Sequence, residues 1–256
     1  MKYLPTFFLL ILSNFCFGQF NETIRTGRPG QAIGAFTVGK NVLQFQQGLD
    51  YYSTAETNLP ERFIFNNVVR YGISETVELS ALVDYQYEDS GVDTAATTLK
   101  GISNLHFGFR VHLNDQKEWL PATGFQMRLK MPDVSEDFEA NHLAPAMVFI
   151  ANWSLPKNMS LATNWILSYN GNDPNPTGKY IVNFGFPIYN KFSGFVENYG
   201  HVNQSVFQTR FDGGFAYLVN NNVSVDLFGG YGHNQNVTDY FVSTGISWRI
   251  ISFKKN

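Results

Sequence analysis

The sequence predicts an all-β fold, a transmembrane antiparallel up-and-down β-barrel, and three observations lead to this prediction. From residue 42 onward, segments of about ten residues alternate apolar and polar side chains, as strands with one face in lipid do. The gaps between these segments are alternately short and long, which is typical of barrels with tight turns at one end. Aromatic residues make up 16% of the chain and charged residues 15%, whereas soluble domains carry about 25% charged residues.

The first 18 residues are predicted to be a cleaved signal peptide. Lys2 supplies the positive start, residues 7–12 form the apolar run, and Gly18 ends the cleavage site with a small residue. A membrane anchor is the alternative, but the run is much shorter than the roughly 18 residues that a spanning helix needs. Cys16 is the sole cysteine, so a chain cleaved after Gly18 can form neither a disulfide nor a thiol nucleophile.

Residues 19–41 show no alternation and contain glycine and proline, which interrupt strands. We expect an irregular N-terminal segment ahead of the barrel. It is either a loose periplasmic tail or a plug that folds into the barrel mouth, and the sequence alone leaves both open. The residues that a plug would use are Arg28, Pro29, Phe36 and Thr37.

The barrel itself is predicted over residues 42–256, with about twelve strands. Alternation is clearest over 105–113, where Leu105, Phe107 and Phe109 alternate with His106 and Gly108. Polar loops are expected near 88–102 and elsewhere between alternate strands. The expected strands are residues 42–51, 62–71, 77–87, 105–113, 125–131, 143–155, 158–169, 180–186, 192–201, 207–217, 223–231 and 240–250.

An even number of strands, as single-chain bacterial barrels have, places both ends of the barrel domain in the periplasm. Tyrosine and tryptophan gather near the expected strand ends, where interfacial girdles of a membrane protein lie. These residues are Tyr51, Tyr71, Tyr87, Trp119, Trp153, Tyr169, Tyr231 and Trp248. A soluble β-sandwich also alternates, but the secretion signal, the long strands and one solidly apolar face favour the barrel.

The inward face of the strands carries charged side chains of both signs. One interpretation is a charged ladder that selects solutes. The other, which the even mixture of signs favours, is that opposite charges pair across neighbouring strands and stiffen the lumen. The expected lumen-lining residues are Arg70, Glu78, Asp84, Arg110, Arg128, Lys130, Glu197, Arg210 and Asp212, together with Lys179, Asp226, Asp239 and Arg249.

Catalytic and cofactor chemistry is not expected. His106 and His112 share a face but stand six strand residues apart, roughly 20 Å, too far to act together. His142, His201 and His233 lie in or near expected outer loops, where polar residues are common in any case. No metal-ligand spacing, phosphate-binding loop or nucleic-acid-binding motif is present, so we expect no metal, no cofactor and no nucleic acid.

Three stretches resemble the outer-membrane transporter family labelled "MetA-pathway of phenol degradation". They are residues 28–46 (RPGQ, FTVGK and LQFQ), 70–79 (RYGISE and VEL) and 101–113 (GISNL and GFR). The chain departs from the family where Gly27, Gln46 and Asn104 replace acidic residues that the family often has. The resemblance implies an outer-membrane β-barrel with a transport role.

From the sequence we therefore expect a protein of the bacterial outer membrane that is not an enzyme. Its expected function is passive passage of small solutes, with apolar or aromatic solutes as candidates. Its expected partners are outer-membrane lipid and small molecules, and nothing in the sequence indicates an oligomeric state. The alternative is a non-conducting outer-membrane barrel with a structural or lipid-modifying role.

Overall fold

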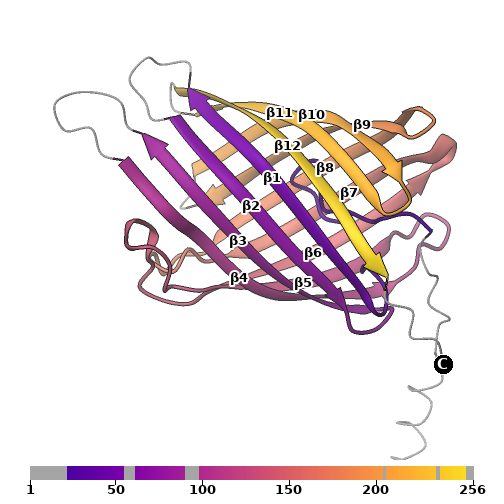
Figure 1. The fold of residues 1–256 in the computed structure, drawn as a ribbon, viewed down its shortest axis with the longest axis horizontal. Coiled ribbons are helices and arrows are strands. Elements are labelled where there is room, and N and C mark those ends of the chain that lie inside the picture. Colours follow the sequence, from indigo (N-terminus) through magenta and orange to yellow (C-terminus); the bar gives the residue numbers. More distant parts are fainter. Residues whose placement is uncertain (1–21, 55–60, 90–97, 204–205, 235–236, 252–256) are drawn as a thin grey trace, which may run out of the picture.

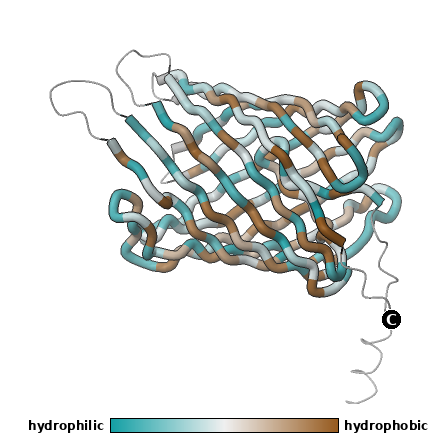
Figure 2. Tube along the Cα trace, viewed as in Figure 1, coloured by the Kyte–Doolittle hydropathy of each residue, from teal (hydrophilic) through white to brown (hydrophobic). Residues whose placement is uncertain are grey.

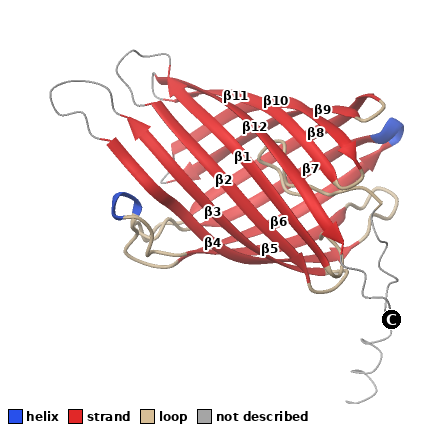
Figure 3. Cartoon of the chain, in the orientation of Figure 1, coloured by secondary structure: helices blue, strands red, loops and turns tan. Residues whose placement is uncertain are grey.

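A computed structural model describes residues 22–54, 61–89, 98–203, 206–234 and 237–251. They form a closed barrel of twelve antiparallel strands, so the predicted fold class is confirmed (Figure 1). The expected signal peptide lies outside the described residues. No helix in the described ranges is long and apolar enough to cross a membrane. Two single-turn 3-10 helices lie in connections at opposite ends of the barrel (Figure 3).

Each strand pairs with its neighbours in sequence, and β12 pairs with β1 to close the barrel. The strands are β1 (Val42–Thr54), β2 (Glu61–Gly72), β3 (Val77–Asp89), β4 (Thr98–Asn114), β5 (Ala122–Lys130), β6 (Ala144–Leu155), β7 (Met159–Ser168), β8 (Thr177–Tyr189), β9 (Phe192–Asn203), β10 (Val206–Asn220), β11 (Val223–Asn234) and β12 (Val237–Ile251), and the 3-10 helices are η1 (Glu136–Phe138) and η2 (Pro156–Asn158).

The start of β1 and the end of β12 lie at the end of the barrel that carries the tight turns. Asn41, just before β1, has a positive φ angle of 59°, and Lys157, Asn158 and Asn190 in the turns have φ angles of 62°, 57° and 49°. Asparagine tolerates this left-handed conformation better than most residues because its short polar side chain bonds to the nearby backbone. We call this end the turn end and the opposite one the loop end.

The fourth strand is longer than its sequence pattern indicates, so the predicted loop over 88–102 is wrong at both limits. β3 continues to Asp89 and β4 begins at Thr98. The register between them shifts at Ser103, because Asp84 pairs with Asn104 while Tyr85 pairs with Ile102. Such a β-bulge places two successive residues on the same side and reverses the alternation. The alternation of apolar and polar side chains is therefore interrupted at the bulge, and the pattern does not indicate the first residues of β4.

The outer surface of the barrel is apolar and its interior is polar, the reverse of a soluble domain. Phe107, Phe149 and Trp165 are 50–59% exposed on the outside. On the inside, Gln44 and Glu78 are fully buried. Figure 2 shows the resulting alternation of hydrophobic and hydrophilic positions along the strands, with hydrophilic connections at both ends. A belt of this kind suits strands that cross a lipid bilayer.

Aromatic side chains occupy the ends of this belt. Tyr71, Tyr87, Tyr169 and Tyr231 are exposed. In the connection between β4 and β5, Trp119 is 76% exposed and its carbonyl oxygen accepts a hydrogen bond from Trp153 Nε1 at 2.9 Å. Amphipathic rings at these positions match the interface between hydrocarbon and water.

Phe107 offers a test of the outward face, because its neighbours Ala81 and Leu129 continue the same apolar surface across β3 and β5. We expect Phe107→Arg to lower the free energy of unfolding in lipid vesicles by about 2–4 kcal/mol, since the guanidinium would enter hydrocarbon. Phe107→Leu is the matched control and should change stability little. Equal unfolding midpoints for the two variants would contradict the assignment of this face to lipid.

Candidate functional site: the barrel interior

Residues 22–41 lie inside the barrel, where they appear as the indigo segment in Figure 1. The segment has no regular structure, so its backbone N–H and C=O groups form hydrogen bonds with side chains of the barrel wall instead of with a neighbouring strand. Ile33 N donates to Asn164 Oδ1 at 2.8 Å, and Asn164 Nδ2 donates back to Ile33 O at 2.9 Å. Ala35 N donates to Asn152 Oδ1 at 2.6 Å. These asparagines place the segment against β6 and β7.

Arg28 fixes the segment to the opposite wall. Its guanidinium donates to Asp226 Oδ1 at 3.0 Å, to Ser243 Oγ at 2.7 Å and to Asn66 Oδ1 at 3.0 Å. Two glycines make room for it, because a Cβ atom at Gly48 would lie 2.2 Å from Arg28 Nη1 and one at Gly245 would lie 2.4 Å from Nε. The bonds therefore join the segment to β2, β11 and β12 at once.

A buried ionic cluster near the turn end adds a third attachment. Arg70 Nε and Nη2 donate to the two oxygens of Glu78 at 2.8 Å each, and Arg110 Nε lies 3.5 Å from Glu78 Oε1. Glu78 Oε2 also accepts from Val38 N at 2.8 Å. Arg110 Nη1 donates to the carbonyl oxygens of Gly34 and Phe36 at 3.0 and 3.2 Å. The three charged side chains thus bind the segment as well as one another.

Glu197 and Asp212 face one another across β9 and β10. Glu197 accepts hydrogen bonds from the backbone nitrogens of Gln31 and Ala32 at 2.8 and 3.0 Å. Asp212 is 7% exposed, and neither of its carboxyl oxygens has a hydrogen-bond partner among the described residues. Glu197 is therefore the member of this pair that attaches the segment.

The residues predicted for a plug have different surroundings. Phe36 stacks on His112 with ring centroids 5.3 Å apart, and the Arg25 guanidinium lies 4.2 Å from the Phe36 centroid on the ring face. Thr37 Oγ1 donates to Glu75 O at 2.6 Å. Pro29 lines a cavity of about 270 Å³ against β8 and β9. Arg28, Pro29 and Phe36 thus contact the inner wall of the barrel, whereas Thr37 bonds to the turn between β2 and β3.

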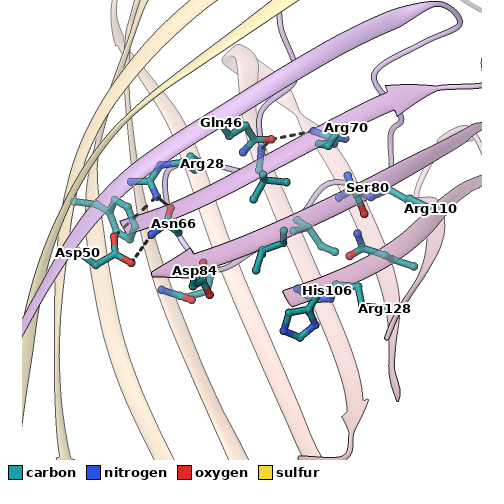
Figure 4. Close-up of a pocket in the computed structure, with 18 of the residues that line it drawn as sticks. Arg28, Gln46, Asp50, Asn66, Arg70, Ser80, Asp84, His106, Arg110 and Arg128 are labelled. Carbon is teal, nitrogen blue, oxygen red and sulfur yellow. Dashed lines mark hydrogen bonds and ion pairs between the residues drawn. The ribbon is translucent and has the colours of Figure 1, made fainter. Parts of the chain in front are cut away.

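A cavity of about 240 Å³ lies between the segment and the wall formed by β1 to β5 (Figure 4). Arg28 and Asp50 border one side of it, and His106 and Arg128 border another. Val68 and Leu82 add an apolar patch. The further lining residues that Figure 4 labels are Gln46, Asn66, Arg70, Ser80, Asp84 and Arg110.

The charged residues expected in the lumen are brought together only in part. Asp84 accepts from Asn104 Nδ2 at 3.0 Å and lines the cavity. Arg210 pairs with Asp239 across Gly232, where a Cβ atom would lie 2.5 Å from Arg210 Cγ. Asp226 pairs with Arg28 of the segment rather than with a neighbouring strand.

Arg249 near the end of β12 donates to the carbonyl oxygens of Glu22 and Thr23. Lys179 lies on β8, and Arg128 and Lys130 lie on β5.

Sequence reasoning missed the neutral and short polar residues that bind the segment. These are Asn66, Asn152, Asn164 and Ser243. The carboxylate of Asp50 also lies 4.0 Å from Arg28 of the segment, and Asn183 donates to Glu197. Their inward parity could have indicated them, but their partner segment has no periodicity.

A closed barrel with an apolar belt and a polar interior defines the class of outer-membrane β-barrels. The model of the family described as "Putative MetA-pathway of phenol degradation" matches residues 26–250, so the chain belongs to that family. The resemblance seen in the sequence is thereby confirmed. No curated protein sequence matches the chain.

Solved structures share the fold at low sequence identity. The COG4313 outer membrane channel from Pseudomonas putida F1 is 10% identical, with 87% of this chain and 99% of that chain covered and a TM-score of 0.60. The NanC porin is 10% identical, with coverages of 80% and 100% and a TM-score of 0.57. The CymD monoaromatic hydrocarbon channel is 11% identical, with coverages of 93% and 100% and a TM-score of 0.51. These likenesses agree with an outer-membrane barrel.

Proposed function

We propose that this protein lets small solutes pass passively across the outer membrane, with apolar or aromatic solutes as candidates. The observation that supports this most is the 240 Å³ cavity inside the closed barrel, lined by both polar and apolar side chains. Pockets for drug-sized ligands span about 300–1,000 Å³, so this cavity suits smaller molecules. The name of the CymD channel, which refers to monoaromatic hydrocarbons, agrees with such a solute class.

We further propose that residues 19–41 act as a plug, preceded by a signal peptide over 1–18 and followed by the barrel over 42–256. The attachments of Arg28, Val38 and Gln31 to charged side chains of the wall support this role. Movement of such a segment would change the width of the passage without any change in the barrel.

We propose no catalytic role for the chain. The similar solved structures include channels and porins. Among the described residues, no group of three or more His, Cys, Asp or Glu side chains could hold a metal ion. His112 is bound to Ala35 O and Asp115 Oδ1, contacts that fix the segment and a turn.

Swelling of liposomes that contain the refolded mature protein tests the proposed function. We expect arabinose to enter such liposomes faster than protein-free ones, and the larger sugar raffinose to be excluded, because the cavity is small. Protein unfolded by heat before reconstitution is the control. Silence of a verifiably folded barrel towards both sugars, and in planar bilayers, would favour the non-conducting structural or lipid-modifying alternative.

A further inference from the structure

Most arginines inside the barrel have an acceptor for the guanidinium group. Arg28 binds Asp226, Arg70 and Arg110 bind Glu78, and Arg210 binds Asp239. Arg128, Lys130 and Lys179 differ, since the side chain of none of the three forms a hydrogen bond or ion pair with any residue that the structure describes. Arg128 Nε is buried without a partner. Three cations of the lumen therefore lack the compensation that the others have.

These three cations lie on one part of the wall. Lys130 pairs in register with His106 on one side and Ala144 on the other, and Arg128 pairs with Gly108 and Ala146. Gly108 admits the stem of Arg128, because a Cβ atom at this glycine would lie 3.0 Å from Arg128 Cγ. Lys179 lies on β8, two strands beyond Ala146, and its charge interacts with that of Arg128. We call Arg128, Lys130 and Lys179 the cationic cluster.

A cluster of like charges in a partly desolvated lumen is unfavourable unless an anion compensates it. The carboxylate of Asp84 interacts with both Arg128 and Lys130 and accepts a hydrogen bond from Asn104. One carboxylate does not balance three cations. The charges thus favour a further negative group from outside the chain.

The cavity beside Arg128 is not uniformly polar. Val68 and Leu82 pair in register next to His106, and all three line the cavity together with Arg128. The arrangement places an apolar patch and a guanidinium around the same cavity of about 240 Å³. A ligand that satisfies both would carry a negative group on a compact apolar body.

We propose that the lumen binds small organic carboxylates, with the carboxylate on the cationic cluster and the apolar body against Val68 and Leu82. Arg128 is the central residue, because a guanidinium can bind a carboxylate through two parallel hydrogen bonds. Lys130 and Lys179 lie nearer the loop end of their strands and attract the anion toward it. Transport of such carboxylates rests on the proposed channel function, whereas their binding to the lumen does not.

Equilibrium binding to the folded protein in detergent micelles, followed by calorimetry, tests the site with two probes of equal size. Benzoate carries the carboxylate and benzyl alcohol is its neutral counterpart. We expect benzoate to bind about tenfold more tightly, as a charge-assisted contact implies, and salt to weaken its binding. The triple variant Arg128→Gln, Lys130→Gln, Lys179→Gln should bind both probes equally.

The matched control removes three lysines from exposed turns: Lys117→Gln, Lys157→Gln and Lys191→Gln. It changes the net charge equally and should keep the preference for benzoate. Equal affinity of the wild type for both probes, or an undiminished preference in the lumen variant, would overturn the proposal. Benzoate binding by a protein that passes no solute would instead leave the site standing and reject the channel. Solute flux without a benzoate preference would reject the carboxylate site and leave the channel function standing.

Discussion

A chain that begins at residue 40 should pass several-fold more ionic current per channel than one that begins at residue 19. The physical reason is that residues 22–41 occupy the lumen and bind β3, β6, β7, β9, β11 and β12. Barrels of eight strands are filled by their own side chains, whereas those of sixteen to eighteen enclose a water channel. In a barrel of twelve strands, removal of this segment should therefore widen a continuous aqueous path. Single-channel recording in planar bilayers measures the difference.

The truncation also frees charged groups such as Glu78 and Glu197, so its effect on folding must be separated from its effect on the pore. A full-length variant in which residues 24–38 are replaced by glycine and serine keeps the chain length but removes the contacts. It should also show raised and noisier conductance. Resistance of the folded form to sodium dodecyl sulfate at room temperature verifies each barrel. Equal conductance of all three folded proteins would show that the segment does not limit the passage.

The strands could be predicted from the sequence because apolar side chains face outward and polar ones inward, so the two kinds alternate along each strand. In β3, Leu79, Tyr85 and Tyr87 face outward and are more than 40% exposed, while Glu78 and Gln86 are buried inside. A period of two is the direct consequence of strand geometry, so this pattern reports on a local property. The bulge at Ser103 broke the pattern in β4, and the start of that strand was missed for this reason.

The position of the segment could not be predicted in the same way, since its partners are remote in sequence. Arg28 and Asp226 are 198 residues apart, and Ile33 and Asn164 are 131 apart. Neither member of such a pair shows a local signal of the other. The interpretation that opposite charges pair across neighbouring strands describes Arg70 with Glu78. It does not describe Asp226, whose partner is in the segment, or the cationic cluster.

Replacement of Glu78 by alanine should lower the free energy of unfolding by about 3–5 kcal/mol, the cost of breaking a buried ion pair by removal of one partner. Glu78 is fully buried and accepts from Arg70 and from Val38 N, while Arg110 lies within ion-pair distance. Without it, two guanidinium groups remain close together with no carboxylate between them. Urea unfolding in lipid vesicles, followed by tryptophan fluorescence, gives the change in stability.

A second variant separates the loss of the ion pair from the loss of packing. Arg70→Met, Glu78→Leu, Arg110→Met removes all three charges and fills a similar volume with apolar atoms. Because the main cost of Glu78→Ala is the uncompensated charge, the triple variant should be more stable than the single one. It should still lose the bonds to Val38, Gly34 and Phe36, and so its conductance should rise toward that of the truncated chain. A triple variant as unstable as Glu78→Ala would attribute the effect to packing, whereas unchanged conductance would mean that Arg28 and Glu197 suffice to keep the segment in place.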